Sequence, residues 1–192
     1  MQKNKAVILT ILLIAALALM PACFAEASPE PTEAPAPMEV EFGTDFAPYD
    51  GIWVPFEDGF KLYLPRDWAA LDVTDEQAAA GLFYLTVGDL PDGSAMAVGV
   101  SYFFGDGLED LDDLAAVMAG RGCENLTPLV LNGIPVVWMD HPGNDYRGVT
   151  FFHPSVPGCA LTVYVSPFAE YGTSAGNATA AVLYSLSPYP AE

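Results

Sequence analysis

The stretch GTSAG at residues 172–176 has the Gly-x-Ser-x-Gly spacing of a nucleophile elbow, in which a serine attacks an acyl carbonyl. That chemistry needs the serine on a sharp turn directly after a strand, followed along the chain by an acid and then a histidine. Both histidines of this chain precede Ser174, and the only acid after it is Glu192. We therefore expect Ser174 to be the N-cap of a C-terminal helix, not a nucleophile.

The two histidines, His141 and His153, are the next candidates for metal binding or proton transfer. The turn signals around them place the two residues at opposite ends of one hairpin, about seven residues or roughly 24 Å apart. We interpret them as a turn residue and a strand-end residue that share no metal ion. In the same hairpin Arg147 is expected directly across from Asp140, with Tyr164 beside it, as a structural cross-strand ion pair.

Acidic residues crowd the segment GDGLEDLDD at residues 105–113. The segment lacks the central glycine and the closing glutamate of an EF-hand loop, and acids at the start of a helix complement its dipole. In a helix Asp110 and Asp113 would share a face while Asp112 points elsewhere, which separates the oxygens. These features argue against calcium binding by this cluster, which also includes Asp106 and Glu109, and we keep it only as an alternative. No cofactor, metal site or catalytic residue is predicted.

Two cysteines, Cys123 and Cys159, lie in the body of the chain. An even number of cysteines in an oxidising compartment permits a disulfide, here closing a loop of about 36 residues that contributes roughly 3 to 4 kcal/mol. The other interpretation is two buried thiols, because free cysteine behaves as a small hydrophobe. The sequence leaves both open.

The chain carries a formal net charge of −19, with 25 acidic residues against six lysines and arginines. Affinity for nucleic acid comes mainly from Lys and Arg neutralising phosphates, so nucleic acid is excluded as a partner. The same charge either keeps an exported protein in solution or attracts cations or a basic partner.

The N-terminus has the form of an export signal, with Lys3 and Lys5 before an apolar run that is too short to span a membrane. Pro21 and Phe24 favour simple cleavage after Ala25 or Ala27 over lipidation of Cys23 as the first mature residue. The Pro-, Glu- and Ala-rich composition of residues 26–43 suits a tether, so lipidation of Cys23 stays open. We predict a signal peptide at 1–25, a disordered spacer at 26–43, a single domain at 44–192, and an extracytoplasmic location, either secreted or at the cell surface, with no transmembrane helix in the mature chain.

Local patterns predict the elements that must position these residues. Strands are expected at 52–56 and 60–64, at 82–88 and 95–103, and in a meander that ends in CALTVYVSP. Thr74 and Gln77 form a capping box for a short helix, and further helices are expected at 109–119 and about 174–185. The Asn132-Gly133 turn puts residue 131 opposite 134 and 127 opposite 138, while the next two turns put 141 opposite 146 and 153 opposite 158.

This register makes both faces of the meander apolar. One face carries Val137, Met139, Phe152, Cys159, Leu161 and Val163, and the other carries Val136, Trp138, Val149, Phe151 and Tyr164. Since both faces must be covered, we predict an α+β fold in which an antiparallel sheet of about six strands has helices on both faces.

The segment GFKLYLPRDWAAL at residues 59–71, followed by a sheet, an acidic helix, a meander and a last helix ending AAVLYSLSP, resembles PsbP-like domains. This family includes an extrinsic photosystem II protein, a Ran-binding import factor and bacterial lipoproteins. The resemblance implies an antiparallel sheet between helices that serves as a docking or accessory surface, and no family partner maps onto residues of this chain.

We therefore expect a non-catalytic binding or accessory domain, on or released from a bacterial cell surface, whose partner is a protein or another envelope component. A secreted hydrolase using acidic residues is the alternative enzyme hypothesis. The strand-spaced aromatic residues between 53 and 68, which could bind sugars or peptides, are expected to be core: Trp53, Phe56, Phe60, Tyr63 and Trp68.

Overall fold

The computed structural model describes residues 36–189, and strands account for 44% of the residues against 21% in helices. The strands are β1 (Met38–Val40), β2 (Gly51–Phe56), β3 (Phe60–Pro65), β4 (Ala69–Ala70), β5 (Leu82–Asp89), β6 (Ala95–Phe104), β7 (Glu124–Leu131), β8 (Ile134–His141), β9 (Tyr146–Phe152), β10 (Cys159–Ser166) and β11 (Ser187–Pro188). The helices are α2 (Asp75–Ala79), α3 (Leu111–Gly120) and α4 (Ser174–Tyr184), with 3-10 turns η1 (Thr44–Phe46) and η2 (Pro142–Asn144). No helix within the described residues is long and apolar enough to cross a membrane.

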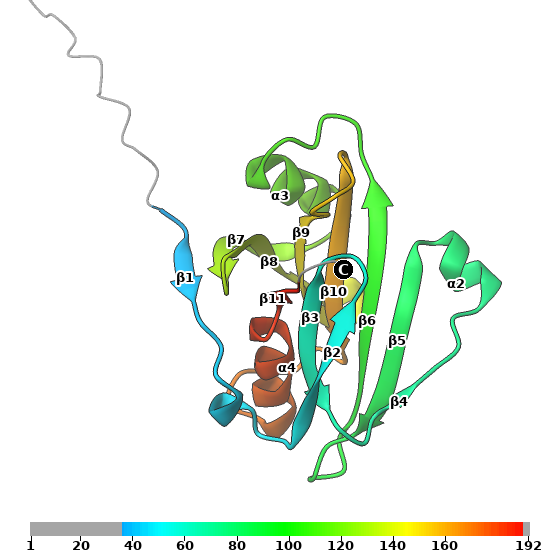
Figure 1. Cartoon of the computed structure of the whole chain (residues 1–192), viewed down its shortest axis with the longest axis vertical. Coiled ribbons are helices and arrows are strands. Elements are labelled where there is room, and N and C mark those ends of the chain that lie inside the picture. Colours follow the sequence, from blue (N-terminus) through cyan, green and yellow to red (C-terminus); the bar gives the residue numbers. More distant parts are fainter. Residues whose placement is uncertain (1–35, 190–192) are drawn as a thin grey trace, which may run out of the picture. The chain divides into compact units, whose positions relative to one another are not determined.

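The strands form two sheets. The large sheet has the order β1-β7-β8-β9-β10-β6-β5-β4, and the small one has the order β11-β3-β2. All neighbours are antiparallel except β1, which pairs parallel to β7. In Figure 1 the small sheet crosses in front of β6 and β10, beside α4.

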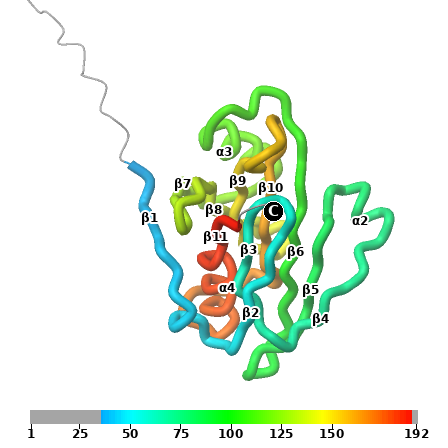
Figure 2. The backbone as a smooth tube through the Cα atoms, viewed as in Figure 1, coloured from blue at the N-terminus to red at the C-terminus, as the bar shows by residue number. Residues whose placement is uncertain are grey.

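The main core lies between the two sheets and α4. Phe60, Leu62 and Leu64 of β3 are buried against Val98, Val100, Phe151, Leu161 and Val163 of the large sheet, together with Ala178, Val182 and Leu183 of α4. Alternation along β3 and β6 puts these side chains on the inner face. Figure 2 shows the same arrangement as a backbone trace, with α4 alongside β3.

The opposite face of the large sheet has one helix over part of it. Leu114 of α3 packs on Val137 and Ala160, and Met118 packs on Met139. Helix α2 buries no residue and lies beyond β5, at the side of the sheet (Figure 1).

The predicted fold class is therefore wrong. The protein is mostly β, with a mixed eight-stranded sheet and a three-stranded sheet, and its few helices do not cover both faces. The reason is that the β2–β3 hairpin joins no edge of the large sheet. It forms a second sheet and takes, together with α4, the covering role that the prediction gave to helices.

Two of the predicted hairpin registers are confirmed, and the third is wrong by one residue. Residues 131 and 134, 127 and 138, and 141 and 146 are paired as expected. The last hairpin pairs Phe152 with Ala160, so its loop is longer than predicted. Because side chains alternate, this slip moves Leu161 and Val163 onto the face of Phe151 and Val149.

The predicted spacer ends earlier than residue 43. Met38–Val40 form β1. The main-chain N–H of Asn132 donates to Val40 O at 2.9 Å, and the main-chain N–H of Phe42 donates to Asn132 Oδ1 at 2.7 Å. The predicted signal peptide, the lipidation candidate Cys23 and the spacer before residue 36 lie outside the described residues.

Candidate functional site

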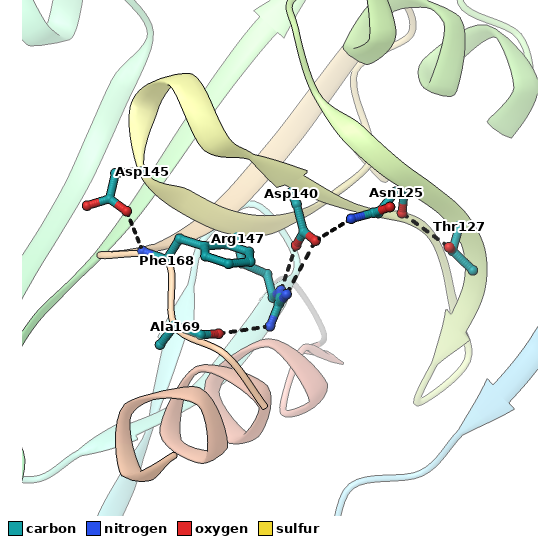
Figure 3. A network of polar contacts seen from close by, with 7 residues as sticks. All are labelled: Asn125, Thr127, Asp140, Asp145, Arg147, Phe168 and Ala169. Atoms are coloured by element: carbon teal, nitrogen blue, oxygen red, sulfur yellow. Dashed lines mark hydrogen bonds and ion pairs between the residues drawn. The ribbon is translucent and has the colours of Figure 1, made fainter. Parts of the chain in front are cut away.

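The buried ion pair between Arg147 and Asp140 is the most elaborate polar group of the described chain (Figure 3). The two residues face each other on β9 and β8, as the sequence predicts. Arg147 Nε donates to Asp140 Oδ1 at 2.6 Å and Nη2 donates to Oδ2 at 3.3 Å, while Asn125 Nδ2 donates to the same Oδ2 at 2.9 Å. The Asp140 and Arg147 side chains are 9% and 4% exposed, so this is a pair largely removed from water.

The loop after β10 closes over the guanidinium. Arg147 Nη1 donates to Ala169 O at 3.2 Å, and the guanidinium carbon lies 4.5 Å from the Phe168 ring centroid and 4.1 Å from that of Tyr171. All three guanidinium nitrogens are thus engaged, which confirms a structural pair that fixes this loop on the sheet. The residue beside Arg147 on β10 is Val165, not Tyr164 as predicted, because of the shifted register.

The two histidines have local roles at separate turns. His141 Nδ1 accepts from the Asn144 amide at 3.1 Å and so caps η2, which confirms the turn interpretation. His153 follows β9, and its Nδ1 accepts from the Ser155 and Val156 amides at 3.0 and 3.2 Å. Its Nε2 lies 3.0 Å from Asp58 Oδ1 in the β2–β3 turn.

The structure brings Asp58, His153 and Cys159 around one hollow, which are the residue types of a cysteine nucleophile with its base and orienting acid. The hydrogen bonds exclude that chemistry. Two backbone amides donate to His153 Nδ1, so its proton resides on Nε2 and is donated to Asp58, leaving no ring nitrogen for the thiol. Burial and then the Asp58 charge raise the pKa of Cys159, the opposite of an activated thiol.

The disulfide that the sequence left open does not form, because both Cys123 and Cys159 are free and buried. Cys123 packs with Met118 and Met139 under α3, whereas Cys159 pairs with Phe104 of β6 and lines the hollow beside Asp58. The strand register therefore puts the two thiols in different surroundings on the two sides of the sheet.

The last helix begins at Ser174, but its N-cap is Thr173, whose side chain accepts from the Gly176 amide at 3.0 Å. The expected cap at Ser174 is thus wrong by one residue. The loop of residues 167–173 separates this helix from β10, which is not the tight strand-to-helix turn of a nucleophile elbow.

The acidic segment is used in capping α3. Asp110 Oδ1 accepts from the Asp112 and Asp113 amides, both at 3.0 Å, and Asp113 Oδ2 accepts from the Glu109 amide at 2.9 Å. These oxygens are directed at backbone amides of their own turn. Within residues 36–189 no group of three potential metal ligands is brought together.

An apolar hollow of about 340 Å³ opens where β6 runs past the end of the small sheet. We call it the aromatic hollow; it is lined by Asp58, Phe83, Tyr102, Phe104, His153, Val156, Cys159 and Leu161. Phe104 is 65% exposed, and Tyr102 and Val156 are each 39% exposed. Their rings form a row, with Tyr102 lying 6.1 Å from Phe83 and 5.8 Å from Phe104 between centroids.

Acidic residues border this row. Asp58 leaves Oδ2 without a partner among the described residues, since His153 binds Oδ1. Beyond Phe104, Asp106 lines the adjoining depression. A surface with ring faces and carboxylates can bind a cationic side chain through cation–π and ionic contacts.

The structure buries some of the aromatic residues expected in the core and exposes others. Phe56 and Phe60 are buried, as predicted, and the structure stacks their rings 4.5 Å apart between centroids. Trp53 is 38% exposed on the outer face of the small sheet, where the Lys61 ammonium lies 4.6 Å from its ring centroid.

Sequence reasoning missed the aromatic hollow. Tyr102 and Phe104 end an apolar strand and share a face by their spacing, which was the available signal. Phe60, Leu62 and Leu64 of β3 pack on the inner face of the large sheet but leave Tyr102 and Phe104 uncovered. Only the packing of the two sheets shows this. Comparison of the chain with protein-family models and with curated proteins finds no match.

Proposed function

We propose that this chain is a non-catalytic binding module that takes a basic protein segment at the aromatic hollow. The observation that carries the proposal is the row of exposed rings, Tyr102 and Phe104 above all, beside the open carboxylate oxygen of Asp58. Large apolar side chains exposed together on a surface are typical of interaction sites.

The distribution of charge supports a basic partner. The four lysines and arginines of the described residues are Lys61, Arg66, Arg121 and Arg147. Arg147 is buried with Asp140, Arg66 is paired with Asp50, and Lys61 lies over Trp53. Lys61 and Arg121 form no ion pair among the described residues. The formal net charge of −19 nevertheless steers cationic partners toward the protein and disfavours anionic ones.

The location follows from the N-terminal pattern and belongs to the same proposal. An export signal would place the domain outside the cytoplasm, held by Cys23 or released. The similarity of residues 59–71 and 180–188 to PsbP-like domains, which act as accessory surfaces, is consistent with a binding role.

The test uses the full chain and a fluorescent peptide in which one leucine is flanked by lysines, compared with the same peptide carrying glutamates. We expect saturable binding of the lysine peptide only. Phe104→Ser and Asp58→Asn should each weaken binding by about ten-fold, because each removes one contact class of roughly 1 kcal/mol or more.

The matched control is Phe46→Ser, since Phe46 is 80% exposed in η1 and does not line the hollow. It should leave the affinity unchanged. Equal binding of the two peptides, or equal effects of Phe46→Ser and Phe104→Ser, would refute the proposal.

A further inference from the structure

A second cavity of about 340 Å³ lies on the opposite face of the large sheet, and we call it the α3-side cavity. It is lined by Gln77, Ala80, Leu82, Ser101, Met118, Arg121, Tyr146, Thr162 and Tyr164. These residues come from α2, α3 and strands β5, β6, β9 and β10 or directly follow them. The cavity exists because the face has only α3 over part of it, with α2 beyond β5.

The lining has an unusual charge for this chain. It contains one arginine and no carboxylate, although 25 of the 192 residues are acidic. Among the described residues the Arg121 guanidinium makes no ion pair and lies 4.0 Å from the centroid of the Phe103 ring. It is the one described cation that neither pairs with a carboxylate nor lies over the small sheet.

Hydroxyl groups supply the other polar contacts. The Ser101 and Tyr164 hydroxyls have no hydrogen-bond partner in the described part of the chain, and Tyr146 Oη lies 4.0 Å from Cys123 Sγ. Burial raises the pKa of Tyr146, while the charge of Arg121, which lines the same cavity, acts in the opposite direction. The cavity therefore presents a cation and neutral donors together.

A glycine lets an aromatic ring form the floor. A Cβ added at Gly99 would lie 2.2 Å from the Tyr164 ring. The Tyr164 ring therefore lies over bare backbone of β6, and its centroid is 5.2 Å from that of Tyr146. Rings, with Leu82 and Met118 at the sides, provide an apolar bed for the body of a ligand.

We infer that the α3-side cavity binds a small organic carboxylate with a ring in its body. The Arg121 guanidinium donates two parallel hydrogen bonds to the ligand's carboxylate, and the ligand's ring packs on Tyr164. The volume is at the lower end of small-molecule sites, which suits a ligand of one ring. This site is independent of the aromatic hollow and takes the opposite charge.

The test titrates the isotopically labelled full chain with benzoate and, separately, with benzamide, its neutral counterpart of similar shape, followed by amide chemical shifts in NMR. Benzoate should shift the Ser101, Arg121 and Tyr164 amides saturably, with an affinity at least about ten-fold above that of benzamide. Arg121→Gln should remove this preference and leave the binding of benzamide unchanged.

Arg66→Gln is the matched control, because Arg66 is an exposed arginine paired with Asp50 and does not line the cavity. It should leave both titrations unchanged, and superposable spectra away from residue 121 establish that Arg121→Gln is folded. The inference fails if benzoate and benzamide bind alike, if Arg121→Gln keeps the preference, or if the shifts occur away from the cavity.

Discussion

Replacing Arg147 by methionine tests whether the buried ion pair holds the domain together. The substitution removes the two hydrogen bonds to Asp140 and the one to Ala169 O, and it keeps an unbranched apolar side chain between the rings of Phe168 and Tyr171. The Asp140 carboxylate then remains buried, and among the described side chains only Asn125 Nδ2 still donates a hydrogen bond to it.

The expected magnitude follows from burial. With side chains 4% and 9% exposed, this pair belongs to the class in which loss of one partner costs about 3 to 5 kcal/mol, because the other charge stays uncompensated. That is about a fifth or more of the stability of an ordinary domain, which is about 5 to 15 kcal/mol. The double variant Arg147→Met with Asp140→Leu removes both charges and should cost less than Arg147→Met alone.

The assay is urea unfolding of the full chain, followed by circular dichroism. Arg66→Met is the control, because the Arg66 and Asp50 side chains are 54% and 77% exposed and their pair is screened by water. Its effect should be several-fold smaller than that of Arg147→Met. Equal effects of these two variants, or a double variant equal to the sum of its singles, would refute the reasoning.

Two further predictions concern the N-terminal part of the domain. Burial, and secondarily Tyr63, raises the pKa of Tyr49, whose hydroxyl donates to Tyr63 O at 2.9 Å. Stability from the neutral phenol is therefore complete below pH about 10 and is lost as the pH rises above it, by up to about 1.4 kcal/mol per pH unit. Urea midpoints of Tyr49→Phe should fall less steeply than those of the wild type in this range, and parallel slopes contradict the assignment. Asn132→Gly keeps the turn, since φ at 132 is 48°, but deletes the side-chain bonds to the Phe42 amide and Leu186 O, among others. It should cost about 1 to 3 kcal/mol and speed hydrogen exchange at Phe42, whereas an unchanged exchange rate would show that Asn132 does not hold β1.

Local chemistry determined much of what the sequence predicts correctly. Asn132-Gly133 fixes a tight hairpin, because both residues must adopt positive φ, and the pairing of 127 with 138 follows from it. The capping box of Thr74 and Gln77 is also confirmed, since both of its hydrogen bonds lie within one turn. The ion pair of Arg147 and Asp140 follows from the pairing of 141 with 146 in the next hairpin, which is set by an equally short turn.

Loops without such a signature were predicted less well. The turn between His153 and Cys159 has no two-residue motif, and a loop longer by one residue reversed the faces of β10. The same error put Tyr164 beside Arg147. It therefore hid the fact that Tyr164 lies with Tyr146 on the α3 side, where the ring forms the floor of a cavity.

The sequence by itself determined the charge of this protein, most of its strands, two of the three predicted hairpin registers, the cap of α2 and, to within one residue, that of α4, because these depend on contacts a few residues apart. Only the tertiary structure decided that the β2–β3 hairpin forms a second sheet and that β1 pairs with β7. It also decided that Tyr102, Phe104 and Arg121 line open cavities. The physical reason is that a strand's alternation says which side chains share a face, but not what covers that face. What covers a face depends on how helices and strands that are distant in the sequence pack against it.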